Sequence, residues 1–357
     1  MSVSDESALF AGTMPVQDKH RFDERALERF MQERVPGFSG SLEVQQFKGG
    51  QSNPTYCLTA GGQRYVLRRK PPGKLLPSAH AVDREYRIIS ALAGTNVPVA
   101  RTYALCEDES VIGTAFYIME HVDGRVLWDA RLPGFSREER AAAFDEMNRV
   151  IAALHQVDYA AVGLEDYGKP GSYFARQIAR WTKQYKASET EAIEAMDRLA
   201  EWLPANTPEG DETTLVHGDF RLDNLIWSHT EPKIIAVLDW ELSTLGHPLA
   251  DFSYHCMMYH FPPDQFRGVL GSPLAELGIP SEEEYIATYC RRTGRTSIPH
   301  WGFYIVYNAF RLAGILQGIM GRVVDGTAAS PHARAMGQRA RAIAEVAWRH
   351  VEQLEGR

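Results

Sequence analysis

Hydrophobic and polar positions alternate in several short segments of the first third of the chain, a pattern that predicts β-strands. The predicted strands are 42–47, 55–59, 64–69, 102–106 and 116–121. Gly61-Gly62 predicts a hairpin turn between the second and third of them. Apolar residues recur at helical spacing over 22–35 and again over 78–93. These patterns predict a small, mostly antiparallel sheet with one helix inserted between its strands.

After about residue 123 the apolar residues recur mainly at helical spacing. Ser136 and Glu139 have the spacing of a capping box, which predicts that a helix begins there. Further helices are predicted over 172–187, 190–203, 303–320 and 332–354, and short strands around 215–217, 224–227 and 234–239. A β-rich part followed by an α-rich part predicts an α+β fold.

Composition and charge narrow the possible functions. The 357 residues are too many for one small core, so two lobes are expected. With 38 basic and 46 acidic residues the formal net charge is −8, which argues against a nucleic-acid partner. The four cysteines form no C-x-x-C pair, so neither a zinc ribbon nor a disulfide framework is predicted. The N-terminus lacks the basic-then-apolar order of a secretion signal, and we expect a cytoplasmic location.

One apolar run, residues 303–320, approaches the length of a membrane span. It contains Asn308, Arg311 and Gln317, and a charge at mid-span costs about 3 kcal/mol on insertion scales. We therefore predict a buried helix here and no membrane span.

The chemistry is indicated by the segment 215–224, Leu-Val-His-Gly-Asp-Phe-Arg-Leu-Asp-Asn, followed by Asp-Trp-Glu at 239–241. Protein kinases carry a comparable pattern, H-R-D-L-x-x-x-N followed by D-F-G. The spacing makes Asp219 the candidate general base that receives the proton of an acceptor hydroxyl. Asn224 and Asp239 offer the hard oxygen atoms that Mg²⁺ requires.

This variant of the motif resembles the aminoglycoside phosphotransferase and choline kinase group. The runs 68–76 and 78–82 narrow the resemblance to the kinase-like domain that some animals carry fused to an acyl-CoA dehydrogenase. The resemblance extends from about residue 22 to 322 and implies a bilobal protein-kinase-like fold that uses ATP and Mg²⁺. It divides the chain into a loose N-terminus (1–20), an N-terminal nucleotide-binding lobe (21–122) and a C-terminal catalytic and substrate-binding lobe (123–357).

A glycine-containing loop between two predicted strands is the candidate phosphate-binding loop. Its residues are Gly49, Gly50, Gln51, Ser52 and Asn53. Glycine lets backbone amides approach a phosphate without interference from a Cβ.

The strand that follows has Arg68 where the kinase pattern has lysine. Arginine can pair phosphate oxygens with a different geometry, and Glu85 in the following helix is its expected partner. The segment 117–122 resembles the hinge between kinase lobes, so the Glu120 carbonyl and the Val122 amide are expected to meet the adenine edge.

Residues around the motif have supporting roles. In the resembling families His217 braces the loop and Asp251 holds it through backbone amides. Arg221 either neutralises the transferring phosphoryl group or forms an ion pair with Asp223 or Glu241, and the sequence leaves both readings open.

Three other classes of protein share parts of this pattern. His217 and Asp219 with a later histidine match the facial triad of non-haem iron oxygenases, but that reading leaves Asn224 and Asp239 unexplained. A kinase-like nucleotide-binding module with little activity is favoured only by Arg68. A protein kinase is disfavoured because eleven residues separate Asp239 from Asp251, too few for an activation segment.

The acceptor is the part of the function that the sequence leaves open. The resemblance suggests a hydroxyl group on a metabolite such as a hydroxyacyl-CoA, with an aminoglycoside as the alternative. Tyr304, Asn308 and Arg311 share one face of an apolar helix, so Asn308 and Arg311 are candidate substrate contacts. A core arginine paired to a buried carboxylate is the competing interpretation. The choice between ATP and GTP and the oligomeric state are not distinguished.

Overall fold

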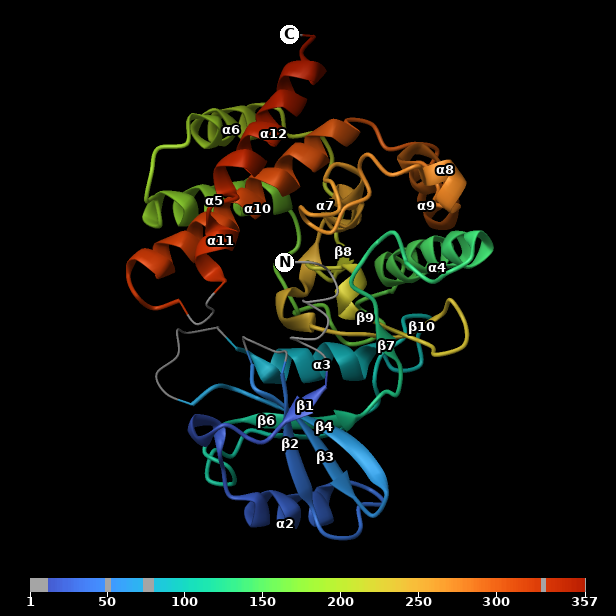
Figure 1. Cartoon of the computed structure of the whole chain (residues 1–357), viewed down its shortest axis with the longest axis vertical. Coiled ribbons are helices and arrows are strands. Elements are labelled where there is room, and N and C mark those ends of the chain that lie inside the picture. The colour runs from blue at the N-terminus through green and yellow to red at the C-terminus, as the bar shows by residue number, and fades with distance from the viewer. Residues whose placement is uncertain (1–11, 49–52, 73–79, 329–331, 357) are drawn as a thin grey trace. The chain divides into compact units, whose positions relative to one another are not determined.

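The computed structural model describes residues 12–48, 53–72, 80–328 and 332–356 (Figure 1). The chain divides into two compact units. The first contains residues 1–167, 221–243 and 273–280, and the second contains 168–220, 244–272 and 281–357. Each unit is described by itself.

The first unit is built on a six-stranded antiparallel sheet of order β1-β2-β3-β4-β6-β5. Its strands are β1 (Thr13–Met14), β2 (Glu43–Phe47), β3 (Thr55–Ala60), β4 (Gln63–Arg69), β5 (Thr102–Cys106) and β6 (Phe116–Glu120). The five predicted strands are confirmed. The sixth, β1, corrects the expectation of a loose terminus, because Thr13 pairs with Phe47 of β2. A short 3₁₀ turn, η1 (Asp18–His20), follows, and residues 1–11 lie outside the described part of the chain.

The two faces of this sheet are covered by different helices (Figure 1). Helix α2 (Glu24–Arg34) begins at the N-cap Asp23 and buries Leu27 and Met31 against Tyr56 and Leu58 of β3. Helix α3 (Val82–Leu92) packs against β5 and β6. Because side chains alternate along a strand, successive residues of β4 face different helices. This alternation determines where the arginines of β4 point.

The rest of the first unit surrounds a three-stranded sheet of order β10-β9-β7. Its strands are β7 (Arg125–Val126), β9 (Leu225–Trp227) and β10 (Ile234–Val237), with the turns η2 (Leu222–Asn224) and η3 (Trp240–Leu242) and the helices α4 (Arg137–His155) and α8 (Leu274–Leu277). The predicted capping box of α4 is present, with the Glu139 amide donating to Ser136 Oγ at 3.1 Å. Strand β10 ends before the predicted residue 239, since Asp239 has a φ of 63° and cannot continue an extended chain.

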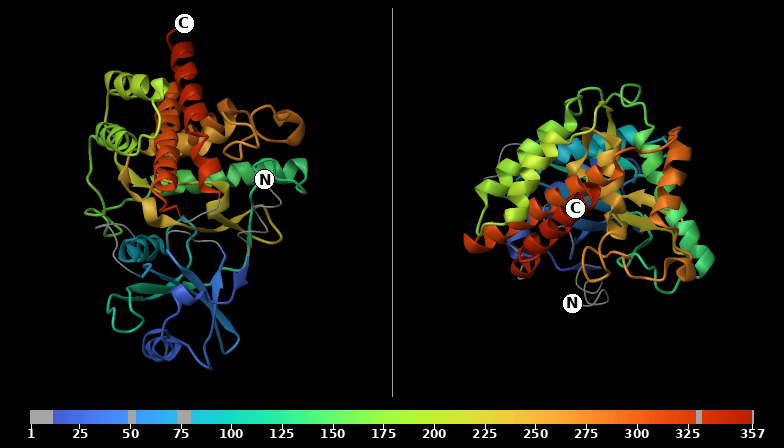
Figure 2. Two further views of the ribbon diagram at one scale, coloured as in Figure 1. Left: turned by 60° about the vertical axis from the view of Figure 1, so that its left-hand side comes forward. Right: turned by 90° about the horizontal axis from the view of Figure 1, so that it is seen from above.

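The second unit is mainly helical. It contains α5 (Tyr173–Ala187), α6 (Glu194–Ala205), α7 (Pro248–Cys256), η4 (Met257–Tyr259), α9 (Glu282–Thr293), α10 (Trp301–Val324), α11 (Ala333–Gly337) and α12 (Ala340–Leu354), with the strand pair β8 (Thr214–Val216) and β11 (Thr244–Gly246). Helix α10 is apolar because it packs against α5, α6, α7 and α12 (Figures 1 and 2). The single helix predicted over 332–354 is in fact two helices, α11 and α12. No helix in the described part of the chain has the length and apolarity needed to cross a membrane.

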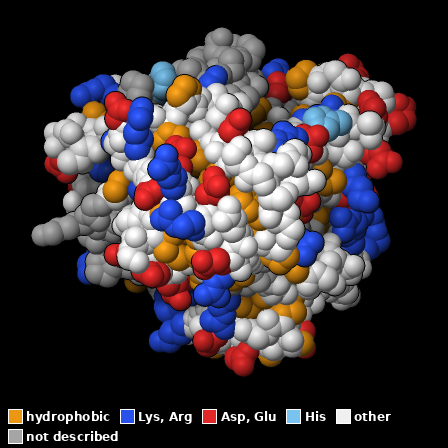
Figure 3. Space-filling model, turned by 90° about the horizontal axis from the view of Figure 1, so that it is seen from below, with side chains coloured by type: hydrophobic (Ala, Val, Ile, Leu, Met, Phe, Trp, Pro, Cys, Tyr) orange, Lys and Arg blue, Asp and Glu red, His pale blue; other side chains and the backbone are white. Residues whose placement is uncertain are grey.

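The compact units do not coincide with the predicted lobes. Residues 123–167 and 221–243 belong to the unit that contains the six-stranded sheet. The functional lobes 21–122 and 123–357 stay a prediction. Acidic and basic side chains are interspersed on the face shown in Figure 3, as expected of a chain with a modest net charge.

Candidate functional site

One arginine of the first unit contacts three carboxylates. Arg68 Nε lies 2.8 Å from Glu85 Oε2, and Arg68 Nη2 lies 2.7 Å from Asp239 Oδ1 and 3.6 Å from Glu241 Oε2. The predicted pair of Arg68 with Glu85 is therefore present. The next residue, Arg69, points to the opposite face of the sheet, as alternation requires. The Arg69 guanidinium lies 5.3 Å from the centre of the Phe22 ring.

Glu85 is enclosed by hydrogen-bond donors. Its side chain is 2% exposed. The Asn53 side-chain amide donates to Oε1 at 2.9 Å, and the Tyr117 hydroxyl donates to Oε2 at 3.1 Å. Asn53 is fully buried, and its Oδ1 lies 2.9 Å from His80 Nδ1. The side chain of Asn53 thus holds Glu85, a contact that the sequence did not indicate.

The charges of this cluster respond to burial and to one another. Burial raises the pKa of Glu85, an effect that the nearby Arg68 opposes. Burial alone would lower the pKa of Arg68, but Glu85 and then Tyr117, Asp239 and Glu241 raise it above its usual value. Arg68 therefore remains a permanent cation at the centre of the cluster.

The other residues of the predicted phosphate-binding loop, Gly49, Gly50, Gln51 and Ser52, lie outside the described residues.

The two predicted metal ligands also lie in the first unit. Asn224 ends η2, and its carbonyl accepts a hydrogen bond of 2.8 Å from the amide of Leu238, the residue before Asp239. This bond places the backbone of Asn224 beside the residue that precedes Asp239. Asp239 has the left-handed φ of 63°, and such backbone strain in a residue other than glycine is concentrated at functional sites.

The donor set fits Mg²⁺ bound together with phosphate. The described residues contain no group of three or more His, Cys, Asp or Glu side chains that could hold a metal ion by themselves. Mg²⁺ typically binds through one or two carboxylates plus phosphate oxygens and water. One carboxylate and one amide oxygen match that preference.

Arg221 forms an ion pair, with its Nη2 3.2 Å from Asp223 Oδ2. This is one of the two roles that the sequence left open. Its contact with a phosphoryl group stays a prediction.

The predicted hinge contacts also stay a prediction. The Glu120 amide donates to the Arg101 carbonyl at 2.7 Å, and its carboxylate accepts from the Arg101 amide at 3.3 Å. Val122 follows the end of β6.

The candidate base lies in the second unit, in the loop after β8. The amides of His217 and Gly218 donate to the two carboxylate oxygens of Asp251, each at 2.8 Å. The Asp219 amide donates to His217 Nδ1 at 3.2 Å. Gly218 has a φ of 82°, which favours glycine at this position. The predicted bracing contacts of His217 and Asp251 are thus both present.

The side chain of the candidate base makes one contact that the sequence did not predict. The Tyr254 hydroxyl donates to Asp219 Oδ1 at 2.7 Å. The signal was available, since Tyr254 follows Asp251 by three residues in a helical pattern and so shares its face.

Two polar residues of α10 are buried and contact other parts of the second unit. Asn308 is fully buried, and its amide donates to the Ala250 carbonyl at 2.9 Å and to Ser253 Oγ at 2.8 Å. Arg311 is 7% exposed and donates to the Gly218 carbonyl at 2.6 Å. This geometry corrects the interpretation of both as substrate contacts, because their donors are directed at protein groups. The competing interpretation, an arginine paired to a buried carboxylate, is also inexact, since the Arg311 guanidinium donates to a carbonyl.

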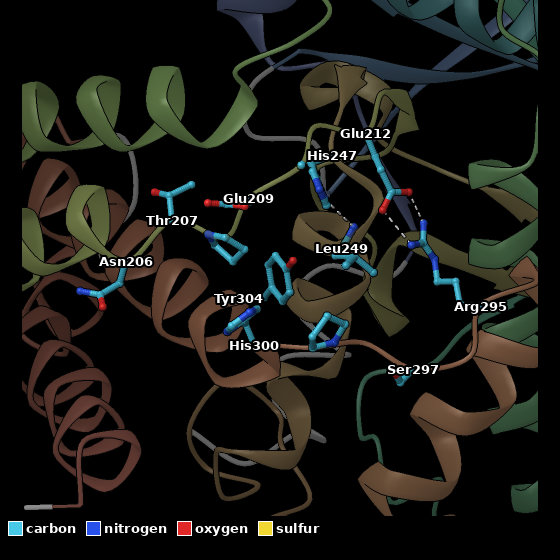
Figure 4. A pocket seen from close by; sticks show the side chains of 13 residues that line it. Asn206, Thr207, Glu209, Glu212, His247, Leu249, Arg295, Ser297, His300 and Tyr304 are labelled. Carbon is cyan, nitrogen blue, oxygen red and sulfur yellow. Dashed lines mark hydrogen bonds and ion pairs between the residues drawn. The ribbon is translucent and has the colours of Figure 1, made fainter.

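A cavity of about 560 Å³ lies elsewhere in the second unit (Figure 4). Its lining includes Glu212, His247, Arg295 and Tyr304, and Arg295 Nη1 donates to Glu212 Oε1 at 2.8 Å. Asp219 does not line it. The cavity is therefore not centred on the candidate base.

Comparison with known proteins identifies the family. Residues 43–302 match the model of the phosphotransferase enzyme family. The chain belongs to this family. The predicted resemblance to aminoglycoside phosphotransferases is thereby confirmed, and by family the chain is a phosphotransferase.

Relatives among characterised sequences carry the domain within longer proteins. Acyl-CoA dehydrogenase family member 10 of Mus musculus is 46% identical over 339 residues, which are 94% of this chain and 32% of that protein. Family member 11 of the same organism is 45% identical over 332 residues, 91% of this chain and 43% of that protein. The chain spans less than half the length of these relatives. The narrower resemblance predicted from the sequence is confirmed.

Solved structures agree on the fold. A Ralstonia eutropha protein, named as a candidate aminoglycoside phosphotransferase, is 60% identical with a TM-score of 0.87, over 93% of this chain and 99% of that one. The aminoglycoside phosphotransferase APH(4)-Ia, in complex with ADP and hygromycin B, is 17% identical with a TM-score of 0.58, over 90% of this chain and 98% of that one. The predicted α+β, kinase-like fold is confirmed.

Proposed function

We propose that the chain transfers the γ-phosphoryl group of ATP, in the presence of Mg²⁺, to a hydroxyl group of a small metabolite. The observation that carries this proposal is the placement of Arg68, whose guanidinium contacts both Glu85 and Asp239. A cation paired with a helix carboxylate and adjacent to a metal-binding aspartate is the arrangement that kinases use for ATP phosphates.

Each residue of the proposed site has a separate role in the reaction. Asp219 orients the acceptor hydroxyl and accepts its proton as the acceptor oxygen forms a bond to the γ-phosphorus. The bond from that phosphorus to the β,γ-bridging oxygen breaks, and its electron pair leaves with ADP. Because such transition states are loose, positioning contributes more than proton removal. Arg68 pairs with the phosphate oxygens and Arg221 lies two residues after the base.

Asn224 and Asp239 would hold Mg²⁺, which neutralises charge on the phosphates when it is bound. Asp239 Oδ1 is engaged by Arg68 in this structure. Binding of the nucleotide therefore requires that Arg68 share its donors between Asp239 and phosphate oxygens.

The acceptor class that we favour is a hydroxyacyl-CoA. The support is the relatives, in which similar sequence forms part of proteins named acyl-CoA dehydrogenases. The hydroxyl group that the kinase reaction needs would have to be present already on the acyl chain, because dehydrogenation of an acyl chain forms a double bond. The alternative proposal, an aminoglycoside acceptor, is supported only by the name of the Ralstonia eutropha protein.

The test is ADP release from ATP, and separately from GTP, in the presence of one acceptor at a time. The panel contains hydroxyacyl-CoAs with the hydroxyl at different positions, the matching free hydroxy acids, kanamycin and choline. We expect turnover with a hydroxyacyl-CoA and a product heavier by one HPO₃, and a loss of about 10²- to 10⁴-fold in Asp219→Ala. Turnover only with kanamycin would reassign the acceptor. If the chain binds nucleotide but turns over none of these acceptors, it is better described as a nucleotide-binding module than as a kinase.

A further inference from the structure

Tyr254 contacts the carboxylate of the candidate base. We propose that it acts as a positioning residue for phosphoryl transfer, holding Asp219 Oδ1 so that the carboxylate has one orientation towards the acceptor hydroxyl. This inference rests on the proposed function, in which Asp219 is the base. The hydrogen bond of 2.7 Å from the Tyr254 hydroxyl to Asp219 Oδ1 is the central observation.

One helix supplies both restraints on the base. Asp251 and Tyr254 lie one turn apart on α7 and share a face. Asp251 accepts hydrogen bonds from the backbone of residues 217 and 218, which fixes the loop that carries Asp219. Backbone bonds leave the side-chain torsions of Asp219 undetermined. The Tyr254 hydroxyl adds a restraint on those torsions.

Tyr254 is itself held in place. Its side chain is 4% exposed. The Arg311 guanidinium lies 4.9 Å from the centre of its ring and also donates to the Gly218 carbonyl. Phe266 contacts the ring edge to face, with the ring centres 5.7 Å apart. A hydroxyl on a ring packed from two sides can hold a carboxylate at one position, because a shift of about 1 Å at a reacting group can cost about 10²-fold in rate.

The backbone conformation of the loop that carries Phe266 is tightly restricted. Phe266 and Arg267 have left-handed φ values of 50° and 51°. A Cβ at Gly268 would lie 1.7 Å from the Phe261 carbonyl oxygen, so residue 268 must be glycine. Strain of this kind persists where the surrounding contacts over-determine the backbone. The loop therefore keeps Phe266 against the Tyr254 ring.

The chemistry of the contact predicts its effect. A phenol that donates to a carboxylate stabilises the ionised form, which is the form that can accept a proton. Hydrogen bonds to charged groups have net strengths that correspond to about a ten- to hundredfold change in an equilibrium. Loss of the hydroxyl alone should therefore reduce the population of correctly oriented Asp219 without removing the ring that packs beside it.

The variant is Tyr254→Phe, with Tyr307→Phe as the matched control. Tyr307 is also buried and lies on α10 in the same unit, and its hydroxyl makes no hydrogen bond among the described residues. We expect kcat to fall about ten- to hundredfold in Tyr254→Phe, with the KM for ATP unchanged. The control should keep the wild-type kcat.

A second measurement separates this inference from the proposed function. With ¹³Cγ-labelled aspartate, the Asp219 resonance is identified by its loss in Asp219→Asn, and its chemical shift is compared at one pH in the wild type and in both phenylalanine variants. A chemical shift that changes only in Tyr254→Phe supports the positioning contact even where no acceptor is turned over, in which case the proposed function alone has failed. An unchanged chemical shift, or a kcat that matches that of Tyr307→Phe, would overturn the role of Tyr254.

Discussion

Replacement of Arg68 by methionine is the sharpest test of the charged cluster. Methionine keeps much of the apolar stem of the side chain and removes the charge. The Arg68 side chain is 12% exposed and that of Glu85 is 2% exposed, so the pair is desolvated. Breaking a buried pair by removing one partner typically costs about 3–5 kcal/mol, because a charge is left buried without compensation. Against a typical total of about 5–15 kcal/mol, this loss is large.

The free energy of unfolding that is lost in Arg68→Met depends on pH, and the ionisation of Glu85 determines whether this loss grows or shrinks as pH rises. Burial raises the pKa of Glu85 in the folded chain, and Arg68 opposes that rise. A carboxyl with a raised folded pKa loses stability as pH increases from the unfolded value, about 4.3, through the folded value. In Arg68→Met the opposing cation is absent, so the folded pKa is higher still. The free energy difference between wild type and variant should therefore widen between about pH 5 and pH 8.

Urea unfolding at pH 5.5, 7 and 8.5 measures this difference, provided that the m value is unchanged. The matched control is Arg87→Met, which removes an exposed ion pair between α3 and Asp166 and should cost less than about 1 kcal/mol at every pH. Adding Glu85→Gln to Arg68→Met should restore part of the loss, since the buried charge is then gone. A cost for Arg68→Met below about 1 kcal/mol, or a double variant no more stable than the single one, would refute the reasoning.

Two further outcomes follow from the described contacts. Asp239→Asn should raise the Mg²⁺ concentration for half-maximal turnover by at least about tenfold, measured by titration at fixed ATP, and an unchanged Mg²⁺ dependence would remove Asp239 from the metal site. Ser136→Ala should lower the free energy of unfolding by about 1 kcal/mol, because the N-cap of α4 is lost; urea unfolding measures it, and turnover should stay at the wild-type level.

Much of the fold could be predicted because hydrophobic periodicity is a local signal. The strands β2 to β6 and the long helix α10 have clear periods and were placed within a few residues. The strand β1 was missed, since two residues carry no period and Thr13–Met14 is a strand only through its pairing with β2. The break between α11 and α12 is likewise not visible in a helical pattern that continues across it.

For the site as well, residues that form a local motif could be predicted, and contacts between distant parts of the chain could not. Asp219, Asn224 and Asp239 were recognisable because their spacing along the chain is a motif. The contacts that hold Glu85 on α3 were not recognisable, because Asn53, just before β3, and Tyr117, on β6, are far from it along the chain. Asn53 was assigned to the nucleotide from its position after two glycines, whereas its side chain is directed at Glu85. Spacing predicts which residues act, and packing decides what holds them.

The polar residues of α10 show that a buried polar side chain can hold part of the site without contacting the substrate. A buried polar group is costly unless it is hydrogen-bonded, so Asn308 and Arg311 in an apolar helix suggested contact with a substrate. Asn308 instead ties α10 to α7 through the Ala250 carbonyl and Ser253, and Arg311 ties it to the Gly218 carbonyl. Since α7 carries Tyr254, α10 fixes the helix and the loop that together hold Asp219. Arg311→Ala should therefore lower kcat by disordering the base, with no selective rise in the KM for the acceptor.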